Sequence, residues 1–447
     1  MSARYLAYKI LFDIEVNGNY SNMALNKYLN EAGLDDQDKG FVTELVYGII
    51  EKKRYLDYMI NKVSKIKVRK MQHPVKLVLR MGVYQLVYMD GVTDYAAINE
   101  SVNIMKKLDK RSASFVNAVL RNISRNLDEV KDISLNTVDK LAIYYSYEKW
   151  IVENLVKEYG FERTEAILRA LSQKPNIYLR VNRTKLRPGQ SMDYLVGQII
   201  GRLIDQGLEA SRGEGLEEAI KVKGLKSIDK HPLFREGYVS VQDISSILVA
   251  KVMDPKRESR VLDLCAAPGG KSTHIGELME NTGHLISQDI FDHKIKLMNT
   301  YARRLGLNNM EARLGDALVL NDDYIGKFDY VLCDVPCSGM GIVRRKPEIK
   351  YKKEEEVENL PDLQYQILEN ASSYLKEGGI LIYSTCTIFK QENTDVVDRF
   401  LNNHKDFDLD DLGPIKEFLG IGDKGLVKIL PDRYEMDGFF ISRMKKI

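Results

Sequence analysis

Cysteine is scarce in this chain of 447 residues: four are present, and none precedes Cys265. So few thiols, confined to one half of the chain, argue against a disulfide scaffold and favour a reducing compartment. There is no CxxC pair and no Cys/His cluster, so we expect no metal site. No apolar run is long enough to cross a bilayer, and the opening residues, Met-Ser-Ala-Arg-Tyr, lack the basic and apolar segments of a signal peptide. We therefore expect a cytoplasmic monomer that has no membrane partner.

An excess of one charge sign is also lacking, because the formal net charge is +2. The overall balance therefore does not require a polyanionic partner. The distribution is uneven, however: ten Lys or Arg lie between Lys52 and Arg80, against one acid, Asp57. Such a cluster attracts phosphate backbones or forms a solvated helix face, and charge alone does not decide between these interpretations.

The pattern of apolar residues changes twice along the chain, which is long enough for two or three domains. Residues 1–138 repeat apolar positions at helical spacing and predict an all-α N-terminal domain. Residues 139–236 alternate helix and strand patterns and predict a small α+β module, which docks RNA or serves as a packing adaptor. Residues 237–447 repeat strand, Gly-rich turn and helix, and predict an α/β Rossmann-like, doubly wound sheet. The strands predicted there are Arg260–Leu264, His284–Gln288, Met310–Arg313, Phe328–Cys333, Ile380–Ser384 and Gly438–Met444.

The turn after the first of these strands has the composition of a cofactor loop. It consists of Cys265, Ala266, Ala267, Pro268, Gly269, Gly270 and Lys271. Small residues let the backbone approach a ligand, and the start of the next helix offers unpaired N–H groups. A phosphate loop would need Gly where Cys265 stands, and the dinucleotide fingerprint Gly-x-Gly-x-x-Gly is absent. The composition therefore predicts a loop for S-adenosylmethionine, which presents a methionyl group and a ribose rather than a pyrophosphate.

Acids follow the next three predicted strands, at Asp289, Asp316 and Asp334. The carboxyl ends of parallel strands meet at one edge of a sheet, so these acids are expected near the loop. Asp289 has the spacing of a carboxylate that accepts ribose hydroxyls, and Asp316 is placed for the adenine amino group. One acidic strand end is commonly a solubility or capping device, but three in succession favour a cofactor site.

Two cysteines follow strands: Cys337 in Asp-Val-Pro-Cys-Ser-Gly and Cys386 in Ser-Thr-Cys-Thr. Such thiols suit methylation at C5 of cytosine, which is a poor nucleophile. A thiolate that adds to C6 makes C5 nucleophilic, and a base removes the C5 proton before the thiol leaves. Asp334 is placed to hold N3 of the adduct. Of the other two thiols, we expect Cys333 to be a core residue and Cys265 to lend its backbone rather than its sulfur.

These motifs resemble the paired Pro-Cys and Thr-Cys motifs of RNA 5-methylcytosine methyltransferases of the Nol1/Nop2/Sun group. By this resemblance, Cys386 is the nucleophile that attacks C6, and Cys337 assists release of the methylated base. The family usually has Ser where this chain has Thr387, which puts little in doubt. The resemblance therefore implies an enzyme that transfers a methyl group to C5 of cytosine in RNA.

The same resemblance extends to the loop at residues 265–271, which matches the S-adenosylmethionine motif of that family. It implies that this loop, Asp289, Asp316 and Asp334 contact the cofactor. Asp334 would also lie against the base, and Lys271 would be a further catalytic residue within reach of the site.

The N-terminal region is similar to the antitermination factor NusB, an RNA-binding helical protein. The likeness is carried by Phe41–Ile50, Arg80–Leu86 and Phe115–Arg121. A NusB-like domain joined to this catalytic domain resembles small-subunit ribosomal RNA methyltransferases, and implies one cytosine of small-subunit ribosomal RNA as the target. The same chemistry on tRNA and a non-catalytic RNA-binding assembly factor remain alternatives. The basic run Arg344–Lys346 is either a clamp on RNA phosphates or a surface patch.

Overall fold

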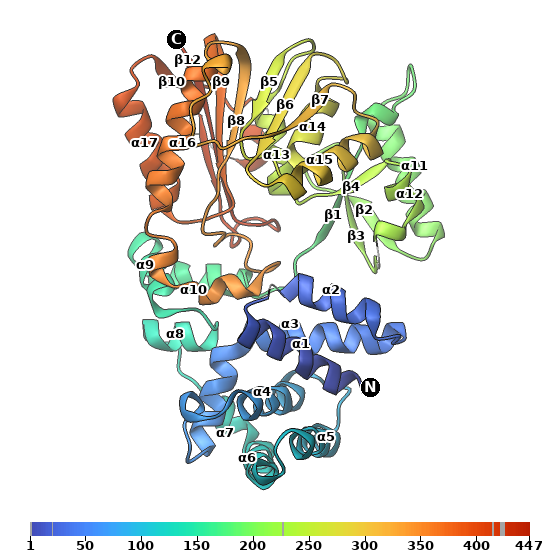
Figure 1. Ribbon diagram of the computed structural model, residues 1–447, viewed down its shortest axis with the longest axis vertical. Helices are drawn as coiled ribbons and strands as arrows, with labels where there is room; N and C mark the ends of the chain where they lie inside the picture. Colours follow the sequence, from blue (N-terminus) through green and yellow to red (C-terminus); the bar gives the residue numbers. More distant parts are fainter. Residues whose placement is uncertain (1, 20, 226–227, 414, 421–424) are drawn as a thin grey trace. The chain divides into compact units, whose positions relative to one another are not determined.

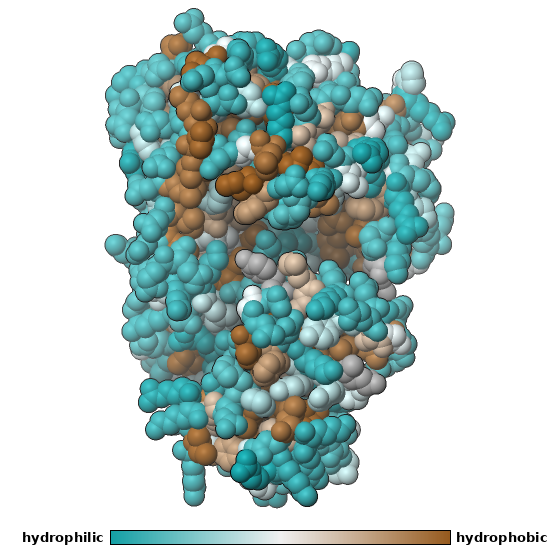
Figure 2. Space-filling view, viewed as in Figure 1, coloured by the Kyte–Doolittle hydropathy of each residue, from teal (hydrophilic) through white to brown (hydrophobic). Residues whose placement is uncertain are grey.

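The computed structural model describes residues 2–19, 21–225, 228–413, 415–420 and 425–447, which form two compact units (Figure 1). Unit 1 comprises residues 1–172 and 345–354, and unit 2 comprises residues 173–344 and 355–447. Polar side chains cover most of the face shown in Figure 2. Within the described residues, no helix is both long and apolar enough to span a bilayer.

Unit 1 is helical, as the spacing of its apolar residues predicts. Its helices are α1 (Ala3–Asn17), α2 (Ser21–Glu31), α3 (Asp36–Val63), α4 (His73–Tyr88), α5 (Asp94–Leu108), α6 (Ala113–Arg125), α7 (Leu127–Lys131), α8 (Val138–Tyr144), α9 (Lys149–Tyr159) and α10 (Phe161–Ala170). The side chains of Ser2, Asp35 and Thr93 cap three of them by accepting a backbone N–H of the first turn. Helix α4 is buried over most of its surface, because apolar residues occupy nearly every side of it.

The basic stretch from Lys52 to Arg80 divides into paired and exposed side chains. Arg80 is only 3% exposed and donates hydrogen bonds to both Asp57 and Glu15, so it stabilises the helical core. Lys53 also lies beside Glu15, at 3.8 Å. The cations that remain exposed are Lys62, Lys65, Lys67, Arg69 and Lys70. Binding of phosphates by this exposed group stays a prediction.

A short segment from the second half of the chain completes unit 1. It contains the 3-10 helix η6 (Pro347–Tyr351), which packs on α3. The ammonium group of Lys350 is buried, donates to the carbonyl oxygen of Tyr145 at 3.2 Å, and lies 4.8 Å from the ring centroid of Tyr147. Burial lowers the pKa of Lys350 to about 7, although Glu51 opposes this effect.

Unit 2 begins with a four-stranded antiparallel sheet in the order β2-β3-β1-β4. Its strands are β1 (Ile177–Val181), β2 (Glu209–Arg212), β3 (Ala219–Lys223) and β4 (Val239–Val241), and α11 (Met192–Asp205) packs against it. The α+β character matches the sequence pattern. Strand β4 lies beyond the expected boundary at 236/237, because three residues are too few to show a periodicity. The boundaries at 138/139 and 236/237 stay predictions.

The second sheet of unit 2 has eight strands among the described residues, in the order β10-β12-β9-β8-β5-β6-β7 with β11 beside β12. They are β5 (Arg260–Asp263), β6 (His284–Asp289), β7 (Met310–Leu314), β8 (Phe328–Asp334), β9 (Leu375–Thr385), β10 (Phe407–Leu409), β11 (Leu426–Ile429) and β12 (Phe439–Lys446). Strands β5 to β9 run parallel, and β10 to β12 are antiparallel additions. All six predicted strands are present, which confirms the Rossmann-like class, whereas β10 and β11 were not predicted.

Helices cover both faces of this sheet (Figure 1). They are α13 (Ile244–Met253), α14 (Gly270–Leu278), α15 (Asp292–Leu305), α16 (Leu360–Tyr374) and α17 (Thr394–Asn403), with the short α12 (Pro232–Arg235) and α18 (Ile415–Leu419) elsewhere in unit 2. Neighbouring strand residues enter different cores: Val261 packs with α13 and α14, whereas Leu262 packs with α16 and α17. This alternation follows from the period of two in a strand.

The buried Lys350 predicts a pH-dependent stability. In the folded chain it is charged only below about pH 7, whereas the unfolded chain keeps the proton up to its ordinary pKa of 10.5. The unfolded chain binds more protons between these values, so the free energy of unfolding contributed by this site rises with pH across that window. We expect Lys350→Met to raise the melting temperature most below about pH 7, and progressively less toward pH 10.

Circular dichroism of the full chain measures this difference. Lys346→Met is the matched control, since Lys346 is exposed in the same segment, and its melting temperature should follow the wild type at every pH. A difference between Lys350→Met and the wild type that does not change with pH would contradict the assignment.

Candidate active site

The residues singled out in the sequence converge at the carboxyl ends of the parallel strands of unit 2. Loop 265–271 follows β5, Asp289 ends β6, and Asp334 ends β8. The neighbouring strands β8 and β9 lead into Cys337 and Cys386. The topology therefore brings together at one sheet edge what lies more than a hundred positions apart in the chain.

The loop after β5 is held by β6. The Ala266 N–H donates to the Gln288 carbonyl at 2.8 Å, and the Ala267 N–H donates to the Asp289 carboxylate at 3.2 Å. Gly270 is the first residue of α14, and a Cβ built there would meet no atom within 4 Å. The start of α14 is therefore open to a ligand, and its backbone N–H groups favour polar or anionic atoms.

Two further acids lie at this edge in different surroundings. Asp289 is nearly buried, accepts a second backbone hydrogen bond from the Phe291 N–H, and has Lys294 at 3.4 Å. Asp316 follows β7, is partly exposed, and accepts the Leu318 N–H at 2.9 Å. Asp289 thus has a structural contact to loop 265–271 besides the ligand contact predicted for it.

Asp263, the last residue of β5, is a site residue that the sequence reasoning missed. Its carboxyl group is fully buried, accepts a hydrogen bond from the Ser272 hydroxyl at 2.6 Å, and its Oδ1 has no partner among the described residues. Burial raises the pKa of Asp263 to about 7, and the charge of Asp334 adds to this effect. An acid inside the apolar run Val-Leu-Asp-Leu was the available signal.

Lys271 and Asp334 form an ion pair between the loop and β8. The Lys271 Nζ lies 2.7 Å from Asp334 Oδ2, and the Ser384 hydroxyl donates to Asp334 Oδ1 at 2.8 Å. Burial opposes the charge of Lys271, but the Asp334 carboxylate outweighs it and raises the pKa of Lys271, with Cys386 contributing. The site thus holds a fixed ammonium group beside a carboxylate and a thiol.

The two strand-end thiols are in contact. The Sγ atoms of Cys337 and Cys386 lie 3.2 Å apart without forming a disulfide bond, and both cysteines are partly exposed. The hydrogen bond to Cys386 and burial raise the pKa of Cys337 well above its ordinary range. Cys333 is fully buried in the core with α16 and α17, as expected. Burial also raises the pKa of the Cys265 thiol well above its ordinary value. Geometry therefore separates the contacting pair Cys337 and Cys386 from the buried Cys333 and the partly exposed Cys265.

Glu392 joins the loops that carry this pair, and the sequence reasoning missed it. It follows β9 in the 3-10 helix η8 (Lys390–Glu392) and is 3% exposed. Its carboxylate accepts the Ser338 N–H at 2.8 Å, the Ser338 hydroxyl, and the Gln364 amide at 2.9 Å. The Ser338 hydroxyl also contacts that of Thr387 at 2.8 Å. The residues that follow Cys337 and Cys386 in the chain, Ser338 and Thr387, thus belong to one buried hydrogen-bond network.

A close backbone contact adds to this network. The Gly341 N–H donates to the Cys386 carbonyl at 2.9 Å, and the Gly438 N–H donates to the Gly341 carbonyl at 2.9 Å. A Cβ at Gly341 would lie 1.9 Å from the Gly438 carbonyl oxygen, so only glycine allows this approach. The Pro-Cys loop is therefore tied to both the Thr-Cys loop and the start of β12.

Arg180 of β1 ties the small sheet to α14. It is fully buried, pairs with Glu277 at 2.8 Å, and donates to the Gly270 carbonyl at 2.8 Å. It also donates to the side chains of Gln242 and Thr273. Breaking such a buried pair leaves an uncompensated charge, so β1 and α14 are held together firmly.

The phosphate clamp suggested for Arg344–Lys346 is wrong for Arg344. Its side chain is 5% exposed and forms an ion pair with Asp437 at 2.9 Å. Arg345 and Lys346 belong to the segment of unit 1, where Lys346 is exposed. The sequence shows a basic run, but it does not show that Arg344 pairs with a buried acid, Asp437, just before β12.

Family models cover three parts of this chain. The model described as 16S rRNA methyltransferase RsmB/F matches residues 250–445, and that of the NusB family matches residues 1–125. The model for the RsmF/B-like methyltransferase ferredoxin-like domain matches residues 147–229. Fold and site together thus define an RNA methyltransferase with a NusB-type helical domain.

Full-length relatives place the chain within one family. It is 40% identical to the "Probable ribosomal RNA small subunit methyltransferase B" of Bacillus subtilis (strain 168), over 100% of this chain and 99% of the relative. It is 32% identical to ribosomal RNA small subunit methyltransferase B of Shewanella oneidensis, over 100% of this chain and 99% of that relative. The chain belongs to the ribosomal RNA small subunit methyltransferase B family.

Solved structures share this architecture. The crystal structure of PH0851 is 26% identical with a TM-score of 0.79, over 100% of this chain and 98% of that one. A methyltransferase homolog protein from Pyrococcus horikoshii is 26% identical with a TM-score of 0.59, over 70% of this chain and 100% of that one. The first of these extends the likeness to the whole chain.

The Glu392 network predicts how the thiols respond to a small change. Glu392→Gln replaces an acceptor with an amide that must present N–H groups toward the donors of Ser338 and Gln364. We expect the loops to loosen and the alkylation rate of Cys337 and Cys386 by iodoacetamide to rise severalfold. Mass spectrometry of the intact, folded chain measures the rate at each cysteine.

Glu377→Gln is the control, since Glu377 is exposed on β9, and it should leave both rates unchanged. Thr387→Ser keeps the hydroxyl that contacts Ser338 and should also behave as the wild type. Equal alkylation rates in Glu392→Gln and Glu377→Gln would contradict the role assigned to Glu392.

Proposed function

We propose that this enzyme transfers a methyl group from S-adenosylmethionine to C5 of a cytosine in small-subunit ribosomal RNA, through a covalent Cys386–C6 adduct. The observation that carries the proposal is the 3.2 Å contact between Cys337 and Cys386 beside the Lys271–Asp334 pair. The names of the relatives support ribosomal RNA as the substrate. The covalent route rests on the chemistry of the two thiols.

The residues around loop 265–271 fit S-adenosylmethionine. The open space at Gly270 leaves room for the ligand at the start of α14, and Asp263 Oδ1 offers a buried acceptor that has no protein partner among the described residues. Asp289 and Asp316 are the acceptors proposed for the ribose hydroxyls and the adenine amino group. When bound, S-adenosylmethionine supplies an electrophilic methyl group.

The side chains of the site each have a part in the proposed reaction. The Lys271 ammonium group, whose raised pKa keeps it charged, favours a thiolate at the neighbouring Cys386. Attack of that thiolate on C6 makes C5 nucleophilic, and Asp334 is proposed to hold N3 of the adduct. Once C5 carries the methyl group, a base removes the C5 proton, the C5=C6 double bond re-forms, and the Cys386 sulfur leaves as a thiolate. Cys337, in contact with Cys386, is proposed to assist this release.

The proposal predicts opposite behaviour for the two thiols. Cys386→Ala should abolish methyl transfer and adduct formation but keep S-adenosylmethionine binding, because the cofactor loop is untouched. In Cys337→Ala, Cys386 should still attack C6, but the methylated base should be released slowly, so that a protein–RNA adduct accumulates. Transfer of labelled methyl to unmodified small-subunit ribosomal RNA and to bulk tRNA, together with a denaturing gel, measures both effects.

Cys333→Ala is the control, since its thiol lies in the core, and it should form no trapped adduct. Label on tRNA alone would keep the chemistry and replace the substrate. If Cys386→Ala stayed active and Cys337→Ala formed no adduct, the two roles would be exchanged: Cys337 would be the nucleophile and Cys386 would assist release. No label and no adduct on either RNA would favour a non-catalytic assembly factor.

The cofactor assignment predicts the effect of filling the space at Gly270. A Cβ atom there would meet no protein atom within 4 Å, so Gly270→Val should fold normally but occupy the ligand's place. We expect the affinity for S-adenosylmethionine to fall at least about tenfold, which corresponds to about 1.4 kcal/mol, in isothermal titration calorimetry.

Gly201→Val is the matched control, because Gly201 also faces open space but lies on α11. It should bind S-adenosylmethionine as the wild type does. Unchanged affinity in Gly270→Val would remove the loop from the proposed cofactor site.

A further inference from the structure

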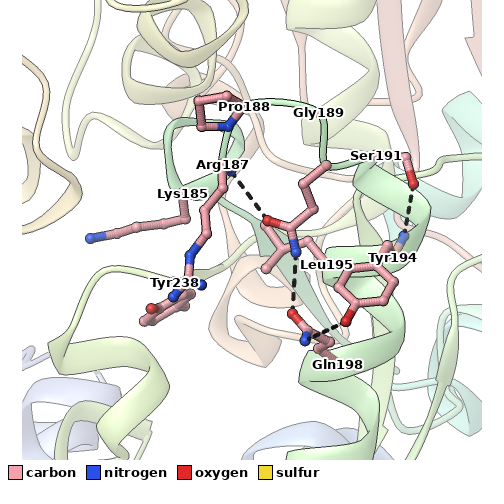
Figure 3. A pocket seen from close by; sticks show the side chains of 10 residues that line it. Lys185, Arg187, Pro188, Gly189, Ser191, Tyr194, Leu195, Gln198 and Tyr238 are labelled. Atoms are coloured by element: carbon pink, nitrogen blue, oxygen red, sulfur yellow. Dashed lines mark hydrogen bonds between the residues drawn. The ribbon is translucent and has the colours of Figure 1, made fainter.

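A cavity of about 610 Å³ lies on the small sheet module of unit 2, where no activity has been assigned (Figure 3). It is formed by the loop between β1 and α11, the first turns of α11, and Tyr238 just before β4. Its lining combines cations, tyrosines and amides without any carboxylate: Lys185, Arg187, Gln190, Tyr194, Gln198 and Tyr238 supply the polar groups. This composition is typical of surfaces that bind single-stranded nucleic acid.

The two cations of the cavity differ from most others of the module. Arg183, Arg212 and Lys221 each pair with a carboxylate. Among the described residues, neither Lys185 nor Arg187 has such a partner, although the Lys185 Nζ lies 5.3 Å from the Tyr238 ring centroid. Two cations without acids beside them leave a local positive charge that attracts phosphate.

The aromatic groups of the cavity differ in their surroundings. Tyr238 is covered by Lys185 and by Arg202, whose Cζ lies 5.6 Å from its ring centroid. Tyr194 instead is 57% exposed, and its side chain is among the most exposed apolar ones of unit 2. A ring exposed to this extent offers a face on which a base can stack.

A chain of hydrogen bonds holds this ring in place. Gln190 accepts the Arg187 N–H and donates its amide to Gln198, and Gln198 donates to the Tyr194 hydroxyl at 3.1 Å (Figure 3). The Tyr194 N–H donates to the Ser191 hydroxyl, which caps α11. The ring is therefore pre-positioned, and the amides beside it can exchange hydrogen bonds with the edge of a base.

We propose that this cavity binds one unpaired nucleotide of the RNA substrate away from the target cytosine, with its base on Tyr194 and its phosphate on Lys185 and Arg187. The inference rests on the proposed function, since it assumes an RNA substrate. Arg180 of the same sheet is bound to Glu277 and Gly270 of the cofactor helix. The cavity therefore keeps a fixed position relative to the thiols within unit 2, and a nucleotide held there helps to orient the target.

Fluorescence anisotropy of the full chain with a labelled oligouridylate tests the site. Tyr194→Ala should weaken binding about tenfold through loss of stacking, whereas Tyr194→Phe keeps the ring and should stay within about twofold of the wild type. Arg187→Ala should weaken binding and lower the slope of log affinity against log salt by about one. Lys230→Ala, which removes an exposed cation elsewhere in the module, should leave both affinity and slope unchanged.

Methyl transfer to small-subunit ribosomal RNA gives the second readout. Tyr194→Ala should raise KM for RNA and leave kcat unchanged. If the wild type transfers methyl groups and both Tyr194→Ala and Arg187→Ala keep its RNA affinity and KM, the nucleotide site is overturned while the proposed function stands. If these variants lost affinity for polyglutamate but kept their affinity for oligouridylate, the nucleotide site would also be overturned. The cavity would then bind an acidic protein. Altered oligouridylate binding without methyl transfer by the wild type would support the site and reject the proposed reaction.

Discussion

The arrangement of the two thiols depends on the buried carboxylate of Glu392. Strands β8 and β9 are parallel neighbours, so their register places the Pro-Cys and Thr-Cys loops side by side. Register does not hold the loops beyond the strand ends, however, and the backbone groups there need partners. Glu392 supplies them by accepting hydrogen bonds from Ser338 and Gln364. An unsatisfied buried group costs about 1–3 kcal/mol, so this network favours the one loop arrangement in which Cys337 meets Cys386.

Arg180 has the same effect on the cofactor side of the site. A buried guanidinium group is costly unless its N–H groups find acceptors, and the two Nη atoms of Arg180 reach Glu277, Gly270 and Gln242. The small sheet and the start of α14 are thereby joined by polar contacts that tolerate few alternatives. The proposed nucleotide cavity and the proposed cofactor loop are thereby linked through Arg180, so the cavity has a defined position relative to the candidate active site within unit 2.

Much of the fold and of the site could be predicted from local patterns. The apolar run before Asp334 predicted β8, and the glycine-rich turn after Asp263 predicted the loop before α14. Asp263 itself was missed: its place inside an apolar run was a signal, but only the structure shows that its carboxyl group is fully buried beside the loop. Glu392 was missed because it lies in a polar segment, Lys-Gln-Glu-Asn, that has no strand or helix periodicity.

The sequence by itself determined the order of the elements, the family, and the residue types at the strand ends. These depend on periodicity and on motifs a few residues long, which act within a short stretch of chain. Only the tertiary structure decided that the Arg344 side chain is buried against Asp437, that residues 345–354 complete unit 1, and that Lys185 and Arg187 have no acidic partner in the described part of the chain. The physical reason is that the role of a polar side chain depends on the partner that reaches it, and such partners lie tens to hundreds of residues away.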